Sequence, residues 1–263
     1  MTTDDPRLDA EYVRRCPGAD DAGDVLLVGV VHDHPASEFR VRELITADQP
    51  DVLALELAPL AIPLFEQYAE ESDSSASETT SEAVDDDSTA DAAHADDDPP
   101  VRGGEMSVAI DAAATDRIEP IDGPSRDFLA SLVATLYRED ATLTDVRRVL
   151  VRFTSISRHV LHCRLAALVG LVRGKPPAVD AKRVHETSWQ DPPEVQAADE
   201  RTQIRKAVSI LNAFETPSHA KYRDETREAY MADRLASLRD QGDVVAVVGM
   251  GHLDAVCDRL DES

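Results

Sequence analysis

The sequence is poor in lysine and in aromatic side chains. It has four lysines (Lys175, Lys182, Lys206 and Lys221), and Phe, Trp and Tyr make up 4% of its residues. Arginine supplies most of the positive charge, and 27 basic residues stand against 52 acidic ones, for a formal net charge of −25. This acidity argues against nucleic acids and anionic lipids as partners, because both attract basic patches. It is typical of halophilic proteins, since concentrated salt screens repulsion within a charged fold; an ordinary acidic protein with one disordered tract is the alternative.

Paired cysteines and long apolar runs are also missing. Cys16, Cys163 and Cys257 form no C-x-x-C pair, which argues against a disulfide framework and a thiolate zinc site. Every apolar run is far shorter than the ~20 residues that span a bilayer. Residues 1–9 are acidic and polar, unlike a secretory signal. We therefore expect a cytoplasmic protein without a membrane span.

Short apolar runs predict the strands of an α/β fold. Residues 25–31 and 244–248 are nearly all apolar and rich in valine, and 51–57 and 117–121 are two further candidate strands. Uninterrupted apolar runs are typical of parallel strands that are covered on both faces. Amphipathic segments between them predict helices at about 37–48, 59–70, 104–114, 194–214, 218–240 and 253–260. The expected fold is therefore a mainly parallel central sheet flanked by helices, in one domain spanning 1–263.

Two segments have a different character. Residues 71–100 consist largely of Ser, Thr, Asp, Glu and Ala, so they bury too little to offset the entropy of ordering, and we predict a disordered acidic insertion. Residues 125–215 predict a mostly helical subregion. Within it, His159 and His162 are one helical turn apart and next to Cys163. They are a weaker metal candidate, for which a partly buried helix is the simpler interpretation.

The two valine-rich strands each lead directly into a glycine–histidine motif. The first closes on Gly-Val-Val-His at His32, and the last closes on Gly-Met-Gly-His at His252. Ligands of open α/β sheets bind at the carboxyl ends of the strands. The two imidazoles, although far apart in the sequence, are therefore expected to share one site. The alternative is a pair of structural histidines with satisfied hydrogen bonds.

Acidic and basic residues at other predicted element ends extend this site. Glu56 lies near the end of an apolar strand, where a buried carboxylate needs a metal ion, an arginine or a histidinium as partner. Glu105 opens a helix behind two glycines, where the helix dipole suits its charge. Asp122 ends the third strand, and we favour a loop residue that caps the next helix. Arg223 and Arg227 are one turn apart and could bind a substrate carboxylate, although a solvated face is the alternative.

These residue types suit metal-assisted hydrolysis. Two imidazoles and a carboxylate, His32, His252 and Glu56, can bind a divalent ion such as Mn, Co or Zn. A metal-bound water can attack a carbonyl, with Glu56 or Glu105 as general base. For Glu56, a structural ion pair with an arginine is the alternative. We expected only solvent-facing or supporting roles for Asp33 and His34, and none for His94, His185 and His219.

The ordered set of motifs resembles the TraB/PrgY family, whose superfamily includes the Tiki proteases and erythromycin-esterase-like proteins. The resemblance rests on VGVVHDHPAS at 28–37, PDVLALEL at 50–57, GGEMSVAIDAA at 103–113, and RDETREAYMADRL with VVAVVGMGHLDAV between 223 and 256. It implies an α/β fold with the two G-x-x-H strands side by side. It also implies His32, Glu56, Glu105, Arg227 and His252 as site residues, and Asp122 matches an Asp at the end of the third strand.

The resemblance implies metal-dependent proteolysis for the Tiki branch, and PrgY-like members are associated with shutting down a peptide signal. The leading hypothesis is therefore a metal-dependent hydrolase of peptide, amide or ester bonds, in which Arg227 holds an anionic group. Two alternatives remain open: a non-catalytic protein that sequesters a peptide, and a metal-independent hydrolase with a histidine base. The substrate would be a peptide or small molecule, and a homo-oligomer is compatible with the sequence.

Overall fold

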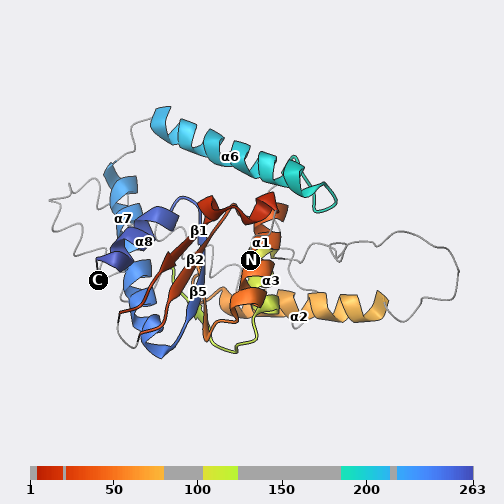
Figure 1. The fold of residues 1–263 in the computed structure, drawn as a ribbon, viewed down its shortest axis with the longest axis horizontal. Helices are drawn as coiled ribbons and strands as arrows, with labels where there is room; N and C mark the ends of the chain where they lie inside the picture. The colour runs from red at the N-terminus through yellow and green to blue at the C-terminus, as the bar shows by residue number, and fades with distance from the viewer. Residues whose placement is uncertain (1–4, 20–21, 80–102, 124–184, 214–217, 263) are drawn as a thin grey trace, which may run out of the picture.

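A mainly parallel five-stranded sheet forms the centre of the molecule (Figure 1). The computed structural model describes residues 5–19, 22–79, 103–123, 185–213 and 218–262. The strands are β1 (Val13–Cys16), β2 (Val25–Val30), β3 (Val52–Leu55), β4 (Ile118–Pro120) and β5 (Val244–Gly249). Their spatial order is β1-β2-β5-β3-β4, and only β1 runs antiparallel to its neighbour. The predicted α/β fold is confirmed.

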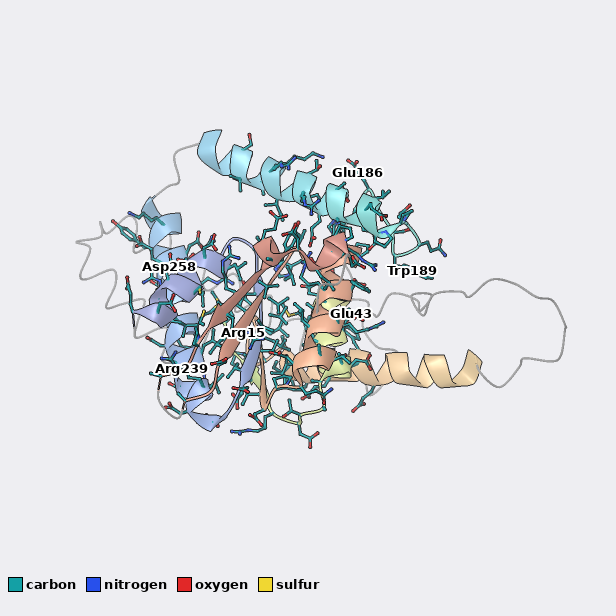
Figure 2. All side chains as sticks on the ribbon, viewed as in Figure 1. Arg15, Glu43, Glu186, Trp189, Arg239 and Asp258 are labelled. Atoms are coloured by element: carbon teal, nitrogen blue, oxygen red, sulfur yellow. The ribbon has the colours of Figure 1, made fainter. Side chains whose placement is uncertain are left out.

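Helices cover both faces of the sheet. The helices are α1 (Pro35–Asp48), α2 (Ile62–Thr79), α3 (Gly104–Ala112), α6 (Pro193–Ala213), α7 (Ser218–Leu238) and α8 (Leu253–Asp261), with short 3-10 turns at Pro6–Leu8, Ala10–Tyr12 and Arg239–Gln241. Side chains of α7 and α8 pack on one face of the sheet, and those of α1 and α3 pack on the other. Charged side chains such as Glu43 on α1 and Asp258 on α8 project into solvent (Figure 2).

The two-sided core explains the apolar runs of the central strands. Along β2, Val25 and Leu27 belong to the core under α7 and α8, whereas Leu26 and Val28 belong to the core under α1 and α3. Successive strand residues point to opposite faces, so a strand covered on both sides has no position for a polar side chain. β1 was not predicted, because this edge strand carries two arginines and resembles no apolar run.

Local signals fix the ends of the elements around the sheet. His34 caps α1, and its Nδ1 accepts a hydrogen bond from the Ala36 N–H, so the helix begins before residue 37, where we predicted its start. Gly103 and Gly104 have φ angles of 93° and 61° at the start of α3. Such left-handed angles are accessible to glycine at little cost.

Some predicted boundaries change in the structure. The strand that we predicted at 51–57 is β3, which ends at Leu55, so Glu56 lies in the loop that follows it. α2 extends to Thr79, so this helix reaches into the segment 71–100 that we predicted as an acidic insertion. Extending an existing helix adds a backbone hydrogen bond for each residue fixed, and this segment contains helix-compatible Ala and Glu. Residues 80–100 of the predicted insertion lie outside the described residues, and so do residues 125–184 and 214–215 of the predicted helical subregion. His94, His159, His162 and Cys163 fall in these parts of the chain.

Candidate functional site

The carboxyl ends of neighbouring strands bring the two predicted histidines to one edge of the sheet. β2 and β5 are adjacent and parallel, and Val30 lies opposite Gly249. His32 and His252 follow these two strands, so they leave the sheet side by side. Glu56 follows β3, which flanks β5 on its other side. This part of the predicted arrangement is therefore present in the structure.

The Glu56 carboxylate lies at the centre of the cluster and is almost fully buried. Its Oε2 accepts a hydrogen bond from the Gly249 N–H at 2.6 Å, and its Oε1 accepts one from Arg227 Nη2 at 2.6 Å. His252 Nε2 lies 3.9 Å from the same Oε1. The structure thus gives Glu56 an arginine partner, which offsets the cost of burying its charge.

Arg227 binds three side chains of the site at once. Its Nε and Nη2 donate to the two Asp122 oxygens at 3.0 and 2.8 Å, and Nη2 also donates to Glu56. Nη1 lies 3.3 Å from His252 Nε2. These contacts use four of the five N–H groups of a guanidinium, which leaves at most one for a substrate. Asp122 is therefore a partner of Arg227, whereas we had favoured a role for it as a helix cap.

Burial alone would lower the pKa of Arg227. The hydrogen bond with Asp122 and the negative charges of Asp122 and Glu56 act in the opposite direction and prevail, so the pKa lies above its ordinary value. The guanidinium is consequently a permanent cation at the centre of the cluster.

The contacts of His252 define its tautomer. Arginine can only donate, so His252 Nε2 accepts from Arg227. The ring proton of a neutral His252 is then on Nδ1, which donates to Glu228 Oε1 at 3.1 Å. We did not predict Glu228 as a site residue, although it is the next residue after Arg227 on α7.

His32 has a carboxylate partner of its own. Its Nδ1 lies 2.6 Å from Glu105 Oε1, and Glu105 Oε2 accepts a hydrogen bond from the Asp33 N–H at 2.9 Å. A carboxylate accepts only, so Nδ1 carries the proton and Nε2 of the neutral ring is the acceptor. The Glu105 side chain is 3% exposed, whereas that of His32 is 41% exposed. A buried anion thus orients a solvent-accessible imidazole.

Gly249 separates His32 from Glu56. A Cβ added to this glycine would lie 3.4 Å from Glu56 Oε2 and 3.8 Å from His32 Nε2. Both polar groups therefore approach the same small volume beside the backbone of β5. Glycine keeps this volume open, which is the close approach that a missing side chain permits.

The site carries surplus negative charge. Its four carboxylates are those of Glu56, Asp122, Glu105 and Glu228. With both histidines neutral, these are opposed by two cations, Arg227 and Arg259, and Arg259 Nη2 lies 4.0 Å from Glu228 Oε2. Two negative charges therefore remain uncompensated among these residues. Such a cluster favours a bound group of positive charge.

A second polar cluster adjoins the site beneath α6. His34 is fully buried, and because its Nδ1 accepts from the Ala36 N–H, its Nε2 carries the proton and donates to Asp199 Oδ2 at 3.3 Å. Burial lowers the pKa of His34 despite the opposing charges of Glu200 and Asp199. We had expected only a supporting or solvent-facing role for His34.

His185 links this second cluster to the first. Its Nε2 lies 2.9 Å from the His32 carbonyl oxygen, and its Nδ1 lies 2.9 Å from Gln203 Oε1. Gln203 Nε2 donates to Asp199, which fixes the orientation of the amide. Both ring nitrogens of His185 therefore face acceptor atoms, one from α6 and one from the loop after β2. We predicted no role for His185 because it stands alone in a polar segment of the sequence.

Two groups of three side chains within the described ranges could hold a metal ion. They are His34 with His185 and Asp199, and Cys16 with Cys257 and Asp261, each with ligand atoms within 4.8 Å of one another.

The remaining candidates lie away from these clusters. Arg223 pairs with its neighbour Asp224 at 2.8 Å on a partly exposed face, in line with the solvated alternative. His219 lies near the start of α7. Within the described ranges, no helix has the length and apolar character needed to cross a bilayer. Comparison of the chain with protein-family models, curated proteins and solved structures found no match.

Proposed function

We propose that the protein is a hydrolase of peptide bonds, or of other amide or ester bonds, with His32 as the general base. The observation that carries this proposal is the contact between the exposed His32 ring and the buried Glu105 carboxylate. A histidine held by a carboxylate at Nδ1 can take a proton at Nε2, because the anion stabilises the imidazolium that forms. Positioned acids and bases of this kind contribute about 10²–10⁴-fold to a rate.

The proposed reaction begins when a water molecule gives a proton to His32 Nε2 as its oxygen attacks the carbonyl carbon. The tetrahedral intermediate then collapses, and the imidazolium returns the proton to the departing nitrogen or oxygen. Arg227 and the Gly249 N–H hold Glu56 in place beside the small volume that Gly249 leaves open next to His32. His252, held by Glu228 at Nδ1 and by Arg227 at Nε2, lies at the same edge and helps to hold Arg227 in place.

We also propose that this chain is related to the TraB/PrgY family. The five residues that the resemblance implies form two hydrogen-bonded groups, His32 with Glu105 and Arg227 with Glu56 and His252. The two groups approach each other at Gly249. This convergence supports the resemblance, because the motifs lie far apart in the sequence and no contact between them was used to propose it.

A metal-dependent hydrolase is the second candidate. The surplus negative charge favours a cation, and both histidines have the carboxylate at Nδ1 that often supports a metal ligand. A divalent ion such as Mn, Co or Zn bound by His32, His252 and Glu56 would lower the pKa of a bound water. In the described geometry, however, Arg227 contacts both His252 Nε2 and Glu56 Oε1. Because this permanent cation occupies two of the three expected ligands, the residues as arranged do not fit the ion.

Removal of metal should separate these two candidates. We expect hydrolysis of a peptide mixture or of p-nitrophenyl esters in concentrated KCl to persist after dialysis against EDTA, because the proposed base needs no ion. Product formation would be followed by mass spectrometry or absorbance. Loss of activity in EDTA and its recovery with MnCl₂, CoCl₂ or ZnCl₂ would instead establish the metal mechanism. Peptides that are bound but remain intact under all conditions would identify a sequestering protein.

A methyl group placed between His32 and Glu56 should block the site without unfolding the protein. Gly249→Ala adds a Cβ at ordinary contact distance from both groups and leaves the backbone N–H that binds Glu56. We expect at least a tenfold loss of activity with an unchanged thermal midpoint. Gly251→Ala is the matched control, because no atom lies within 4 Å of its added Cβ. Equal activity of the two variants would show that the volume beside Gly249 is not used.

A further inference from the structure

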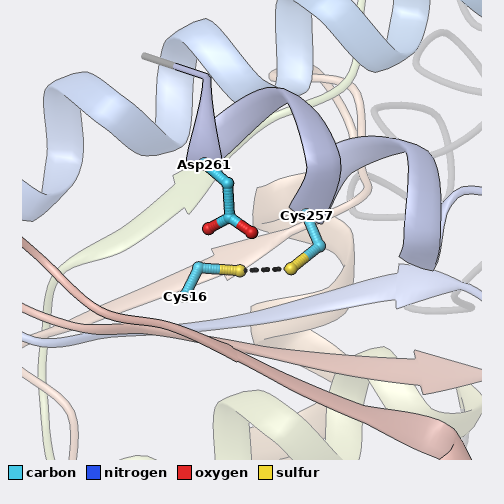
Figure 3. A group of neighbouring side chains, drawn as sticks. All are labelled: Cys16, Cys257 and Asp261. Carbon is cyan, nitrogen blue, oxygen red and sulfur yellow. Dashed lines mark hydrogen bonds between the residues drawn. The ribbon is translucent and has the colours of Figure 1, made fainter.

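Two thiols meet where the first strand packs against the last helix. Cys16 ends β1 and Cys257 lies on α8, 241 positions later in the sequence, yet their Sγ atoms are 2.7 Å apart (Figure 3). Cys16 is buried and Cys257 is half-buried. The sequence showed three isolated cysteines and argued against a disulfide framework. Because β1 and α8 come from opposite ends of the chain, spacing in the sequence could not reveal this pair.

We propose that Cys16 and Cys257 are a modification site that forms an intramolecular disulfide. Both sulfurs point toward each other from elements of the same core, and bond formation requires them to close from 2.7 Å to about 2.05 Å. A zinc ion is a poorer fit, because two thiolates at about 2.3 Å from one tetrahedral ion lie about 3.8 Å apart. Asp261 is the third member of the group. Its negative charge disfavours a pair of thiolates but not an uncharged disulfide.

Oxidised glutathione is a sufficient oxidant for this reaction. The thiolate of Cys257 attacks the glutathione disulfide and releases one glutathione thiolate. The thiolate of Cys16 then attacks the Cys257 sulfur of the mixed disulfide and releases the second. Two protons pass to solvent and two electrons to glutathione. Burial, together with the neighbouring Cys257, raises the pKa of the Cys16 thiol, so the more exposed Cys257 is the thiol that reacts first.

The cross-link would fasten α8 to the sheet at one edge of the core. His252 is the residue that precedes α8, and β1 pairs with β2, which leads to His32. Oxidation would therefore restrain both elements that present the histidines. It would also close nearly the whole chain into one loop, which restricts the unfolded state.

Alkylation of the full-length protein tests the proposal. In a Cys163→Ser background, which leaves only these two thiols, treatment of the folded protein with oxidised glutathione should remove two hydrogen atoms from its mass. Both cysteines should then resist N-ethylmaleimide after unfolding until a reductant is added. Non-reducing electrophoresis should show a faster monomer, and the urea midpoint should rise. The variants Cys16→Ser and Cys257→Ser, in the same background, should each abolish the loss of two hydrogen atoms, the faster monomer and the rise in the urea midpoint, because a single remaining thiol can go no further than a mixed disulfide with glutathione.

Three results would overturn the proposal. Two reactive thiols after oxidation would show that the bond does not form, and disulfide-linked dimers would show that the cysteines react between molecules. Stoichiometric zinc in the reduced protein that is lost in Cys257→Ser would identify a metal site instead. Because Cys257 is half-buried, its serine variant is expected to fold even if Cys16→Ser does not.

Discussion

Replacing His32 with glutamine is expected to lower the hydrolytic rate by about 10²–10⁴-fold, the usual contribution of a positioned general base. Glutamine retains a polar side chain but cannot accept a proton from water at neutral pH. The effect should appear in kcat and leave KM nearly unchanged, because the ring acts on water and not on substrate binding. Initial rates with the best substrate from the peptide and ester screen would measure both constants.

Glu105→Gln tests whether the carboxylate supports the base. The amide has the same shape, so the start of α3 should persist, but it lacks the charge that stabilises a protonated His32. We expect kcat to fall in the same direction as for His32→Gln, with little further loss in the double variant, since the two residues act as one unit. Glu43→Gln, which removes an exposed charge from α1, is the control. Full activity of Glu105→Gln would exclude the proposed role of the pair.

The sequence was sufficient to predict the edge of the sheet at which this site lies. Runs such as 25–31 and 244–248 are typical of strands that are covered on both faces of an α/β sheet, and parallel strands present their carboxyl ends at one edge. His32 and His252 therefore had to face the same side. The two histidines follow adjacent strands because the strand order is β2-β5-β3. We predicted this adjacency from the family resemblance, because the apolar runs do not specify the order of the strands.

The hydrogen-bond partners of the site residues could not be predicted from the sequence. Arg227 could have bound substrate, but its donors are directed to Asp122, Glu56 and His252. That outcome depends on the distances between side chains from three elements, which no spacing along the chain encodes. His185 was missed for a similar reason, because its two partners, Gln203 and the His32 carbonyl, come from α6 and from the loop after β2.

The largest effect on stability is expected from a buried ion pair that no sequence motif indicated. Arg40 on α1 and Glu200 on α6 are 160 positions apart and fully buried, with Nη2 and Oε2 at 2.5 Å. Arg40 also donates to the carbonyls of Arg7 and Gly29 and lies over the Tyr12 ring. Charged residues on amphipathic helices usually face solvent. Here they join α6 to the layer that supports the site.

Glu200→Leu should reduce the free energy of unfolding by about 3–5 kcal/mol, the usual cost of leaving one member of a buried ion pair without its partner. Ser37 Oγ, which donates to Glu200 Oε1 at 2.5 Å, would lose its acceptor as well. Denaturant unfolding in concentrated KCl, where surface charges are screened, would measure the change.

The double variant Arg40→Met/Glu200→Leu distinguishes an unpaired charge from simple loss of packing. If the cost arises from the uncompensated guanidinium, adding Arg40→Met should restore much of the stability, because apolar replacements of buried ion pairs are often neutral. Arg201→Ala is the matched control on the same helix. Arg201 binds Asp9 and Glu11 at the surface, and exposed pairs of this kind are worth about 0–1 kcal/mol. A Glu200→Leu effect no larger than that of Arg201→Ala would mean that the α1–α6 contact does not depend on this pair.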